Sequence, residues 1–307
     1  MDGWTLLFDL REALHERSDS DWLNDQISYT YLYEAAAELN SRIASITSTQ
    51  SITTIAETSE YRLNPDFMGL YLRDGENRFY VKLNDGTNDF FITHKSYEDV
   101  IYDNLTTSQT IPDWFTIKAA TTQLSNVTGT ASADGTVSSG EATLTDTSSS
   151  TKFSNISAGD WVHNTTSGYH GIVLEKTSGT VLATAIFDSV GTASSWTASD
   201  SYVVVPQPRY SIVFEPPTST AAYTVTVFYL KKPDPVFAPY RSYKFPVETK
   251  RELVQYAAGR YKYRDRDLQT GNAMFQFSDR SAMVTSGIVK VSTNRGGFKM
   301  NLKGKRA

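Results

Sequence analysis

The chain has 307 residues, of which 39% are apolar and 21% charged, and its richness in Ser, Thr and Tyr favours β-structure. It contains no cysteine, which excludes disulfides, thiol catalysis and cysteine-ligated zinc. The net charge of −5 is unevenly spread: residues 241–307 carry 15 Lys or Arg against 5 Asp or Glu, whereas residues 1–240 carry 14 against 29. This asymmetry indicates a particle with two different neighbours, or chance clustering on a solvated surface.

Membrane and export signals are missing from the sequence. No apolar run reaches the roughly 20 residues that a membrane helix needs. The N-terminal segment carries acidic charge early and lacks a small-residue cleavage site, unlike a secretion signal. We therefore expect a protein that is made in the cytoplasm and has no membrane partner.

Two helices are predicted at the N-terminus. Apolar side chains recur at three-and-four spacing from Trp4 to near Ser18, which indicates the first helix. Ser20 then provides a start signal for a second helix, whose broad apolar stripe runs from Trp22 to Ile43. A helix that is apolar on more than one face packs between neighbours. We therefore predict a helix hairpin docked on a domain, or a helix shared between subunits.

Beyond Ser48 the apolar period falls to two, which predicts β-strands. The expected elements are strands over 51–58, 67–72, 78–83 and 111–118 and one short helix over 96–102. The strands at 67–72 and 78–83 are expected to be joined by a turn. Residues 209–214 and 223–230 are predicted to pair as a hairpin around the proline-rich turn at 215–220.

An unusual composition separates residues 121–206 from the rest. Thr, Ser, Gly and Ala dominate its first part and charges are scarce, which alone would fit a flexible linker. Short apolar strands nevertheless continue at regular spacing as far as residue 205, with Ser-Gly and Asp-Ser turns between them. We therefore predict an inserted all-β module, either a barrel or a sandwich.

The C-terminal part is predicted to return to helix and then to end in an arm. One helix contains Leu253 and Tyr261, and a second covers about 271–283. The arm, residues 288–307, contains no acidic residue, and apolar and basic side chains are interleaved in it. Such an arm can add as an edge strand to a partner with an acidic surface, although a disordered terminus is the alternative.

Together these elements predict an α+β fold. An N-terminal helix pair and C-terminal helices would pack on a small antiparallel β domain, forming a body of residues 1–120 and 207–287. The all-β module, residues 121–206, would be inserted in this body, and the extended basic arm, residues 288–307, would follow it.

No metal or cofactor site is predicted. The sequence contains only four histidines, His15, His94, His163 and His170. The last two could touch, but no third ligand has supporting spacing, so surface histidines are the better interpretation. The sequence contains no phosphate-binding loop, nucleophile elbow or zinc-protease motif.

Hydrolysis is the one enzymatic alternative that the carboxylates leave open. Asp160, Asp188 and Asp200 all fall in predicted turns of the module. A glycosidase needs two carboxylates a few ångströms apart, but turn chemistry explains each aspartate more simply. We therefore predict that the protein is not an enzyme and has no catalytic residues.

Three segments of the body carry a family resemblance. The first is the helix that opens at Trp22-Leu23-Asn24 and runs to Leu39, and the second is Glu60-Tyr-Arg-Leu-Asn-Pro-Asp-Phe67. The third runs from Phe214-Glu-Pro-Pro217 to Lys231-Lys-Pro233. Together they resemble the head-to-tail adaptor (connector, or head-completion) proteins of tailed bacteriophages, over roughly 1–120 and 207–285. Simple adaptors lack the insertion, which is similar to small β-modules of other phage structural proteins.

The resemblance implies a structural virion protein in the neck between capsid and tail. Adaptors form a homo-oligomeric ring, commonly of twelve copies, that binds the portal protein and presents a docking surface for the tail or nozzle. The ring continues the channel for genomic DNA, which passes during ejection without sequence-specific recognition.

The resemblance also implies roles for particular residues. The C-terminal arm would insert into the portal, through Lys290, Arg295, Phe298, Lys299, Met300, Leu302, Lys303, Lys305 and Arg306. Subunits would pack through the second helix, by way of Trp22, Tyr29, Tyr33 and Leu39.

Two other functions remain alternatives. A tail, fibre-attachment or receptor-binding component would contact carbohydrate through exposed Trp161, Tyr169 and Trp196 on one face of the module. A polysaccharide hydrolase would require a cleft with paired carboxylates.

Overall fold

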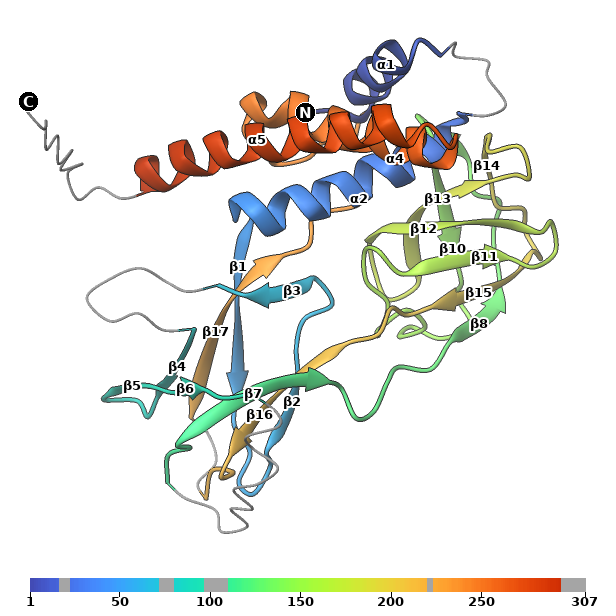
Figure 1. The fold of residues 1–307 in the computed structure, drawn as a ribbon. Coiled ribbons are helices and arrows are strands. Elements are labelled where there is room, and N and C mark those ends of the chain that lie inside the picture. Colours follow the sequence, from blue (N-terminus) through green and yellow to red (C-terminus); the bar gives the residue numbers. More distant parts are fainter. Residues whose placement is uncertain (17–22, 72–79, 97–109, 220–222, 294–307) are drawn as a thin grey trace, which may run out of the picture.

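The structure is a computed structural model that describes residues 1–16, 23–71, 80–96, 110–219 and 223–293 (Figure 1). Side chains of the last helix are described as far as Met283. Within these residues the fold is α+β, with four α-helices and three sheets that are antiparallel apart from one short parallel pair. None of the sheets closes into a barrel. The predicted α+β class is therefore confirmed.

The two N-terminal helices are α1 (Gly3–Leu14) and α2 (Asp25–Ile43). The Asp2 side chain caps α1 by accepting a hydrogen bond from the Thr5 N–H, and Asn24 caps α2 in the same way. The first helix ends before Ser18 because His15 adopts a left-handed conformation, with φ of 56°. The predicted start signal at Ser20 and the first stripe residue, Trp22, lie outside the described residues.

The C-terminal helices are α4 (Lys250–Arg264), which follows the short 3-10 helix η1 (Val247–Thr249), and α5 (Leu268–Thr293). The prediction of an extended arm from residue 288 is wrong for residues 288–293, which are helical. No proline interrupts α5, and each added residue extends a helix cooperatively once its first turn has formed. The rest of the predicted arm, 294–307, lies outside the described residues.

The four helices form a bundle in which α2 and α4 are central. Both α1 and α5 pack against α2 and against α4, and α2 packs against α4. The close α4–α5 approach depends on Gly259, where an added Cβ would lie 2.9 Å from the Phe275 ring. At its C-terminal end α5 projects beyond the rest of the bundle (Figure 1). No helix in the described part of the chain is long and apolar enough to cross a membrane.

Two sheets lie below the bundle and share one core. The first contains β1 (Thr47–Thr53), β17 (Thr224–Lys231), β4 (Val81–Asn84) and β5 (Asp89–Phe91) in that order, with β3 (Phe67–Leu70) also paired to β17. The second contains β2 (Glu60–Arg62), β16 (Tyr210–Glu215), β7 (Trp114–Ala119) and β6 (Thr93–His94). Side chains from both, such as Val227 and Phe214, are buried together.

The predicted hairpin of residues 209–214 and 223–230 is wrong. The corresponding strands belong to different sheets, because β16 pairs with β2 and β7 whereas β17 pairs with β1, β3 and β4. Strands β3 and β4 likewise each pair with β17, end to end along it, rather than returning on each other. In each case the strand pairs with segments distant in sequence, and the cross-strand pairs it forms there stabilise the sheet. The predicted helix at 96–102 falls almost wholly outside the described residues.

The third sheet contains all strands between residues 127 and 205. Its order is β8 (Val127–Thr130), β15 (Ser201–Val205), β11 (Trp161–Asn164), β12 (Tyr169–Lys176), β13 (Val181–Phe187), β10 (Glu141–Thr145) and β9 (Val137–Ser138), with β14 (Ala193–Ser194) beside β13. One face encloses a core around Phe153 and Trp196. The other face presents Ile172 and Phe187 to the helix bundle.

Candidate functional site

The outer face of α1 carries two large aromatic side chains that nothing in the described structure covers. Trp4 and Phe8, one helical turn apart, are 63% and 62% exposed, whereas Leu6 and Leu10 on the opposite face are fully buried. With their neighbours the two aromatics line a hollow of about 450 Å³, here named the α1 groove: Trp4, Leu7, Phe8, Arg11, Glu12 and Glu16. Exposed aromatics gathered in this way mark an interaction surface.

The rim of the α1 groove is acidic, and its floor holds an unpaired donor. The Arg11 guanidinium is bound to Asp25 at 2.6 Å, but its Nε is buried without a hydrogen-bond acceptor among the described residues. Glu16 accepts a hydrogen bond from the Tyr261 hydroxyl at 3.1 Å, and burial together with this carboxylate raises the pKa of Tyr261 to about 12. Glu12 is exposed. The groove therefore suits a partner with cationic and flat apolar groups.

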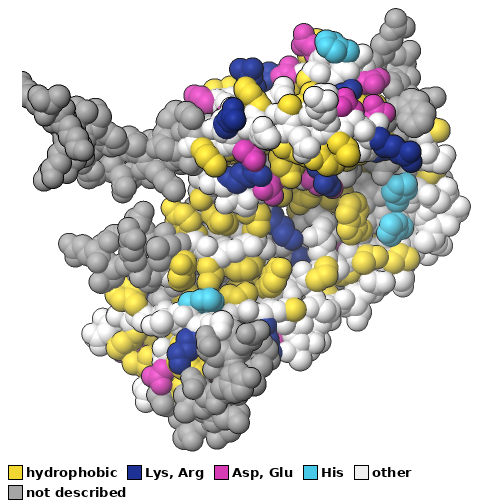
Figure 2. Space-filling model, viewed as in Figure 1, with side chains coloured by type: hydrophobic (Ala, Val, Ile, Leu, Met, Phe, Trp, Pro, Cys, Tyr) yellow, Lys and Arg dark blue, Asp and Glu magenta, His cyan; other side chains and the backbone are white. Residues whose placement is uncertain are grey.

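Charge elsewhere on the bundle is largely paired. Figure 2 shows charged side chains of both signs gathered over the helices, and hydrophobic side chains gathered below them over the sheets. Arg260 on α4 lies 2.8 Å from Glu34 on α2, and Lys250 lies 2.6 Å from Asp9 on α1. These pairs connect helices within one chain, so they do not by themselves define a binding surface.

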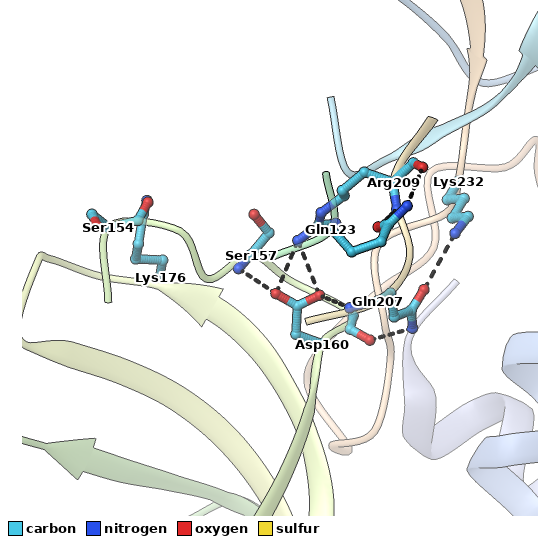
Figure 3. Close-up of polar contacts among 9 residues, drawn as sticks. Gln123, Ser154, Ser157, Asp160, Lys176, Gln207, Arg209 and Lys232 are labelled. Atoms are coloured by element: carbon cyan, nitrogen blue, oxygen red, sulfur yellow. Dashed lines mark hydrogen bonds and ion pairs between the residues drawn. The ribbon is translucent and has the colours of Figure 1, made fainter. Parts of the chain in front are cut away.

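A buried ion pair fixes the module to the body (Figure 3). Asp160, beside the start of β11, receives two 3.1 Å contacts from the Arg209 guanidinium, and both side chains are at most 3% exposed. The same carboxylate accepts hydrogen bonds from the Ser157 and Gln207 N–H groups at 2.8 and 2.9 Å. Its acceptor positions are thus filled, which makes it a structural clamp rather than an acid or base. Burial nevertheless raises the pKa of Asp160.

The two chain crossings between body and module lie side by side at this clamp. The Gln123 side chain in the first crossing accepts a hydrogen bond from the Arg209 N–H in the second, at 2.9 Å. Lys232 donates to the Gln207 side chain at 3.2 Å, and burial together with the Arg209 charge lowers the pKa of Lys232 (Figure 3). A hollow of about 310 Å³ borders these residues. The junction therefore joins the two crossings through the contacts of these side chains.

A second carboxylate, Glu60 on β2, holds the first crossing from the body side. It accepts hydrogen bonds from the Thr121 N–H at 2.8 Å and the Thr121 hydroxyl at 2.6 Å, and it pairs with Lys118 at 2.9 Å. Burial alone would raise the pKa of Glu60, but these hydrogen bonds outweigh it and lower the pKa to about 2. The carboxylate therefore stabilises the fold only while it is ionised.

Glu60→Gln is expected to reduce the dependence of stability on acid. Because the folded-state pKa lies below the unfolded value of about 4.5, the contribution is complete above pH 4.5 and is lost as the pH falls toward 2. Since the group is partly exposed, the wild type should lose about 1 kcal/mol more than the variant across this window. Urea denaturation of both proteins near pH 4.5 and near pH 2 measures this difference in the free energy of unfolding. Equal losses in the wild type and the variant would rule out a contribution from ionised Glu60.

The predicted subunit-interface residues are mostly buried within the chain. Tyr29 is 2% and Leu39 4% exposed, because α1, α4 and the 236–238 segment cover them. Their assignment to a contact between subunits is therefore wrong for this structure. Tyr33 is partly buried and packs edge-on against Phe237. Trp22 lies outside the described residues.

The three predicted external-contact residues do not share a face. Trp196 is 1% exposed and donates its indole N–H to the Thr184 hydroxyl at 3.0 Å inside the module, so its assignment to an external contact is wrong. Trp161 is 44% exposed, and Tyr169 is partly buried. These two lie at opposite ends of the β11–β12 pair. Sequence alone cannot separate a core tryptophan from a surface one, because both suit a β-strand.

The remaining predicted residues are placed as follows. Lys290 is part of helix α5. The other predicted arm residues, from Arg295 onward, lie outside the described part of the chain. His163 and His170 face each other across β11 and β12. No group of three His, Asp or Glu side chains that could hold a metal is present among the described residues. Asp188 and Asp200 accept backbone hydrogen bonds within turns, as turn chemistry predicts.

Sequence reasoning missed the two features that the structure makes most prominent. It placed Trp4 and Phe8 on a helix but did not distinguish them from the leucines that are buried. Helical spacing could have done so, because Trp4, Phe8 and Glu12 recur every four residues on one face whereas Leu6 and Leu10 lie on the other. The Asp160–Arg209 pair, 49 residues apart, has no local signal.

Comparison with known proteins does not assign the chain to a family. A scan against protein-family models found no match, and a search of curated proteins found none either. Functional inference therefore depends on the residues and contacts of the chain itself.

Proposed function

We propose that the protein is a ring-forming head-to-tail adaptor of a tailed bacteriophage, located in the virion neck between portal and tail. The observation that carries the proposal is the α1 groove, where two large aromatics are exposed on a helix of the bundle. An apolar surface of this kind is stabilised when a neighbouring subunit covers it. Repetition around a ring multiplies one modest interface into a stable assembly.

The arrangement of the chain supports a body with an inserted module. The strands between residues 127 and 205 pair only with one another among the described residues, and both crossings lie side by side at the Asp160–Arg209 clamp. In the proposal, residues 1–120 and 207–287 form the adaptor body and residues 121–206 form the module. The clamp would hold every module of the ring at the same angle.

The charge asymmetry supports a ring with two different ends. The basic C-terminal region would bind the portal, and α5, which projects beyond the bundle, would carry the arm toward it (Figure 1). The tail or nozzle would bind elsewhere on the ring. Genomic DNA would pass along the channel through contacts that do not depend on its sequence.

Deleting residues 294–307 is expected to leave a folded protein that no longer binds the portal. The deletion removes five basic and no acidic residues and stops where the described helix α5 ends. Portal binding should fall by about tenfold or more, because several charge-assisted contacts are lost together. Co-sedimentation with the cognate portal ring measures this, with circular dichroism as the check on folding.

A deletion variant that binds the portal as tightly as the wild type would remove the proposed role of the arm. A matched control replaces two sheet lysines by serine, the partly buried Lys82 on β4 and the exposed Lys176 on β12. This control lowers the positive charge away from the arm and should bind the portal normally.

A further inference from the structure

The two outer helices of the bundle lie on opposite sides of it. Both α1 and α5 pack on the central pair α2 and α4, which places them at opposite corners of a four-helix arrangement. Their exposed faces therefore point away from each other. A surface on α1 and a surface on α5 cannot meet within one chain, but they can meet between two copies.

The exposed face of α5 carries small, amide and basic side chains, and it ends in Met283, which is 73% exposed. Ala273, Gln276 and Arg280 are exposed at three- and four-residue spacing, while Ser278 and Ala282 on the other side are buried. No acidic partner of Arg280 is found among the described ion pairs. The stripe from residue 273 to residue 280 begins with the small side chain of Ala273 and ends with the cationic side chain of Arg280.

The α5 stripe complements the α1 groove group by group. On α1, Trp4 and Phe8 are followed by the exposed carboxylate of Glu12, eight residues or about 12 Å along the helix from Trp4. On α5, seven residues, or about 10.5 Å of helix, separate Ala273 from Arg280. Parallel alignment would bring Arg280 to Glu12 as an ion pair and lay the small and amide side chains of α5 over the two aromatic rings.

A further attraction suits this alignment. A guanidinium beside an aromatic ring gains cation–π attraction, so Arg280 can contact both Phe8 and Glu12. A second copy of α1 would offer no cation to pair with Glu12, because the only basic side chain of α1, Arg11, is already bound to Asp25.

We infer that the α1 groove of one subunit receives the Ala273–Arg280 face of α5 from the next copy of the chain. The inference rests on the proposed ring and specifies its interface. Two different surfaces meet in this contact, so it is head-to-tail and generates a closed ring when the rotation between copies closes. The basic end of each α5 would then extend past its neighbour toward one end of the ring.

Charge reversal tests the inference. Glu12→Arg should raise the concentration at which half of the chains are assembled by about tenfold or more, because two cations then face each other. Arg280→Glu should do the same with two anions. The double variant Glu12→Arg/Arg280→Glu should restore assembly to near the wild-type concentration. Mass photometry over a dilution series, with and without portal rings, measures all four proteins.

The control is Glu57→Arg, the same charge reversal in the β1–β2 turn, which should assemble as the wild type does. Single variants that assemble normally would overturn the inference while leaving the ring intact. Single variants that fail without recovery in the double variant would overturn the Glu12–Arg280 contact. A wild-type chain that stays monomeric, alone and with portals, would overturn the ring and with it the interface.

Discussion

Replacing both Trp4 and Phe8 by serine is expected to abolish assembly without unfolding the chain. Both side chains are more than 60% exposed, so their removal should change the free energy of unfolding by no more than about 0.5 kcal/mol each. At an interface, by contrast, truncation of a central aromatic residue costs about 2 kcal/mol or more. Every interface of a ring loses both residues, so the assembly should dissociate to monomers. Light scattering reports the mass, and urea denaturation reports the stability.

Trp161→Ser is the matched control for this variant. It removes an indole that is 44% exposed on β11 of the third sheet, which is not part of the α1 groove. The control protein should keep the wild-type mass. If the Trp4/Phe8 variant also keeps that mass, the α1 groove is not an assembly surface.

Arg209→Met is expected to be the most destabilising single change at the junction. It leaves the Asp160 carboxylate buried with only the Ser157 and Gln207 N–H groups as partners. Removing one member of a buried pair costs about 3–5 kcal/mol, because the remaining charge is uncompensated. Adding Asp160→Asn should recover part of this loss, because it removes the uncompensated buried charge while the amide oxygen can still accept one of the two hydrogen bonds. Urea denaturation at neutral pH measures each free energy of unfolding.

The comparison that decides this prediction is Arg260→Met. It makes the same substitution in the exposed Arg260–Glu34 pair, where the side chains are 46% and 41% exposed. An exposed pair contributes about 1 kcal/mol or less. If Arg209→Met costs no more than Arg260→Met, the junction is not a buried clamp.

Elements with strong local signals could be predicted from the sequence. The periodic segments around Leu10, Leu32 and Leu253 are helices, and the regular short strands of 127–205 form one sheet. Local period and capping determine such elements, so no distant contact is needed to find them. The end of α5 could not be predicted, because a basic, glycine-free stretch such as 288–293 is compatible with either helix or arm.

Pairing and burial could not be predicted, because they depend on residues far away in the chain. The partner of Val227 on β17 is Gln50 on one side and Val81 on the other, not a residue of the adjacent β16. Tyr29 and Trp196 carry the same sequence signals as exposed aromatics, yet both are buried by elements more distant in sequence. The α1 groove likewise becomes visible only once the bundle shows which face of α1 remains uncovered.

The mass of the purified protein, alone and mixed with cognate portal rings, tests the central claim most directly. The proposal predicts a closed ring in solution, or a monomer that becomes a ring on the portal. A protein that remains a monomer or a trimer and does not respond to portals would contradict it.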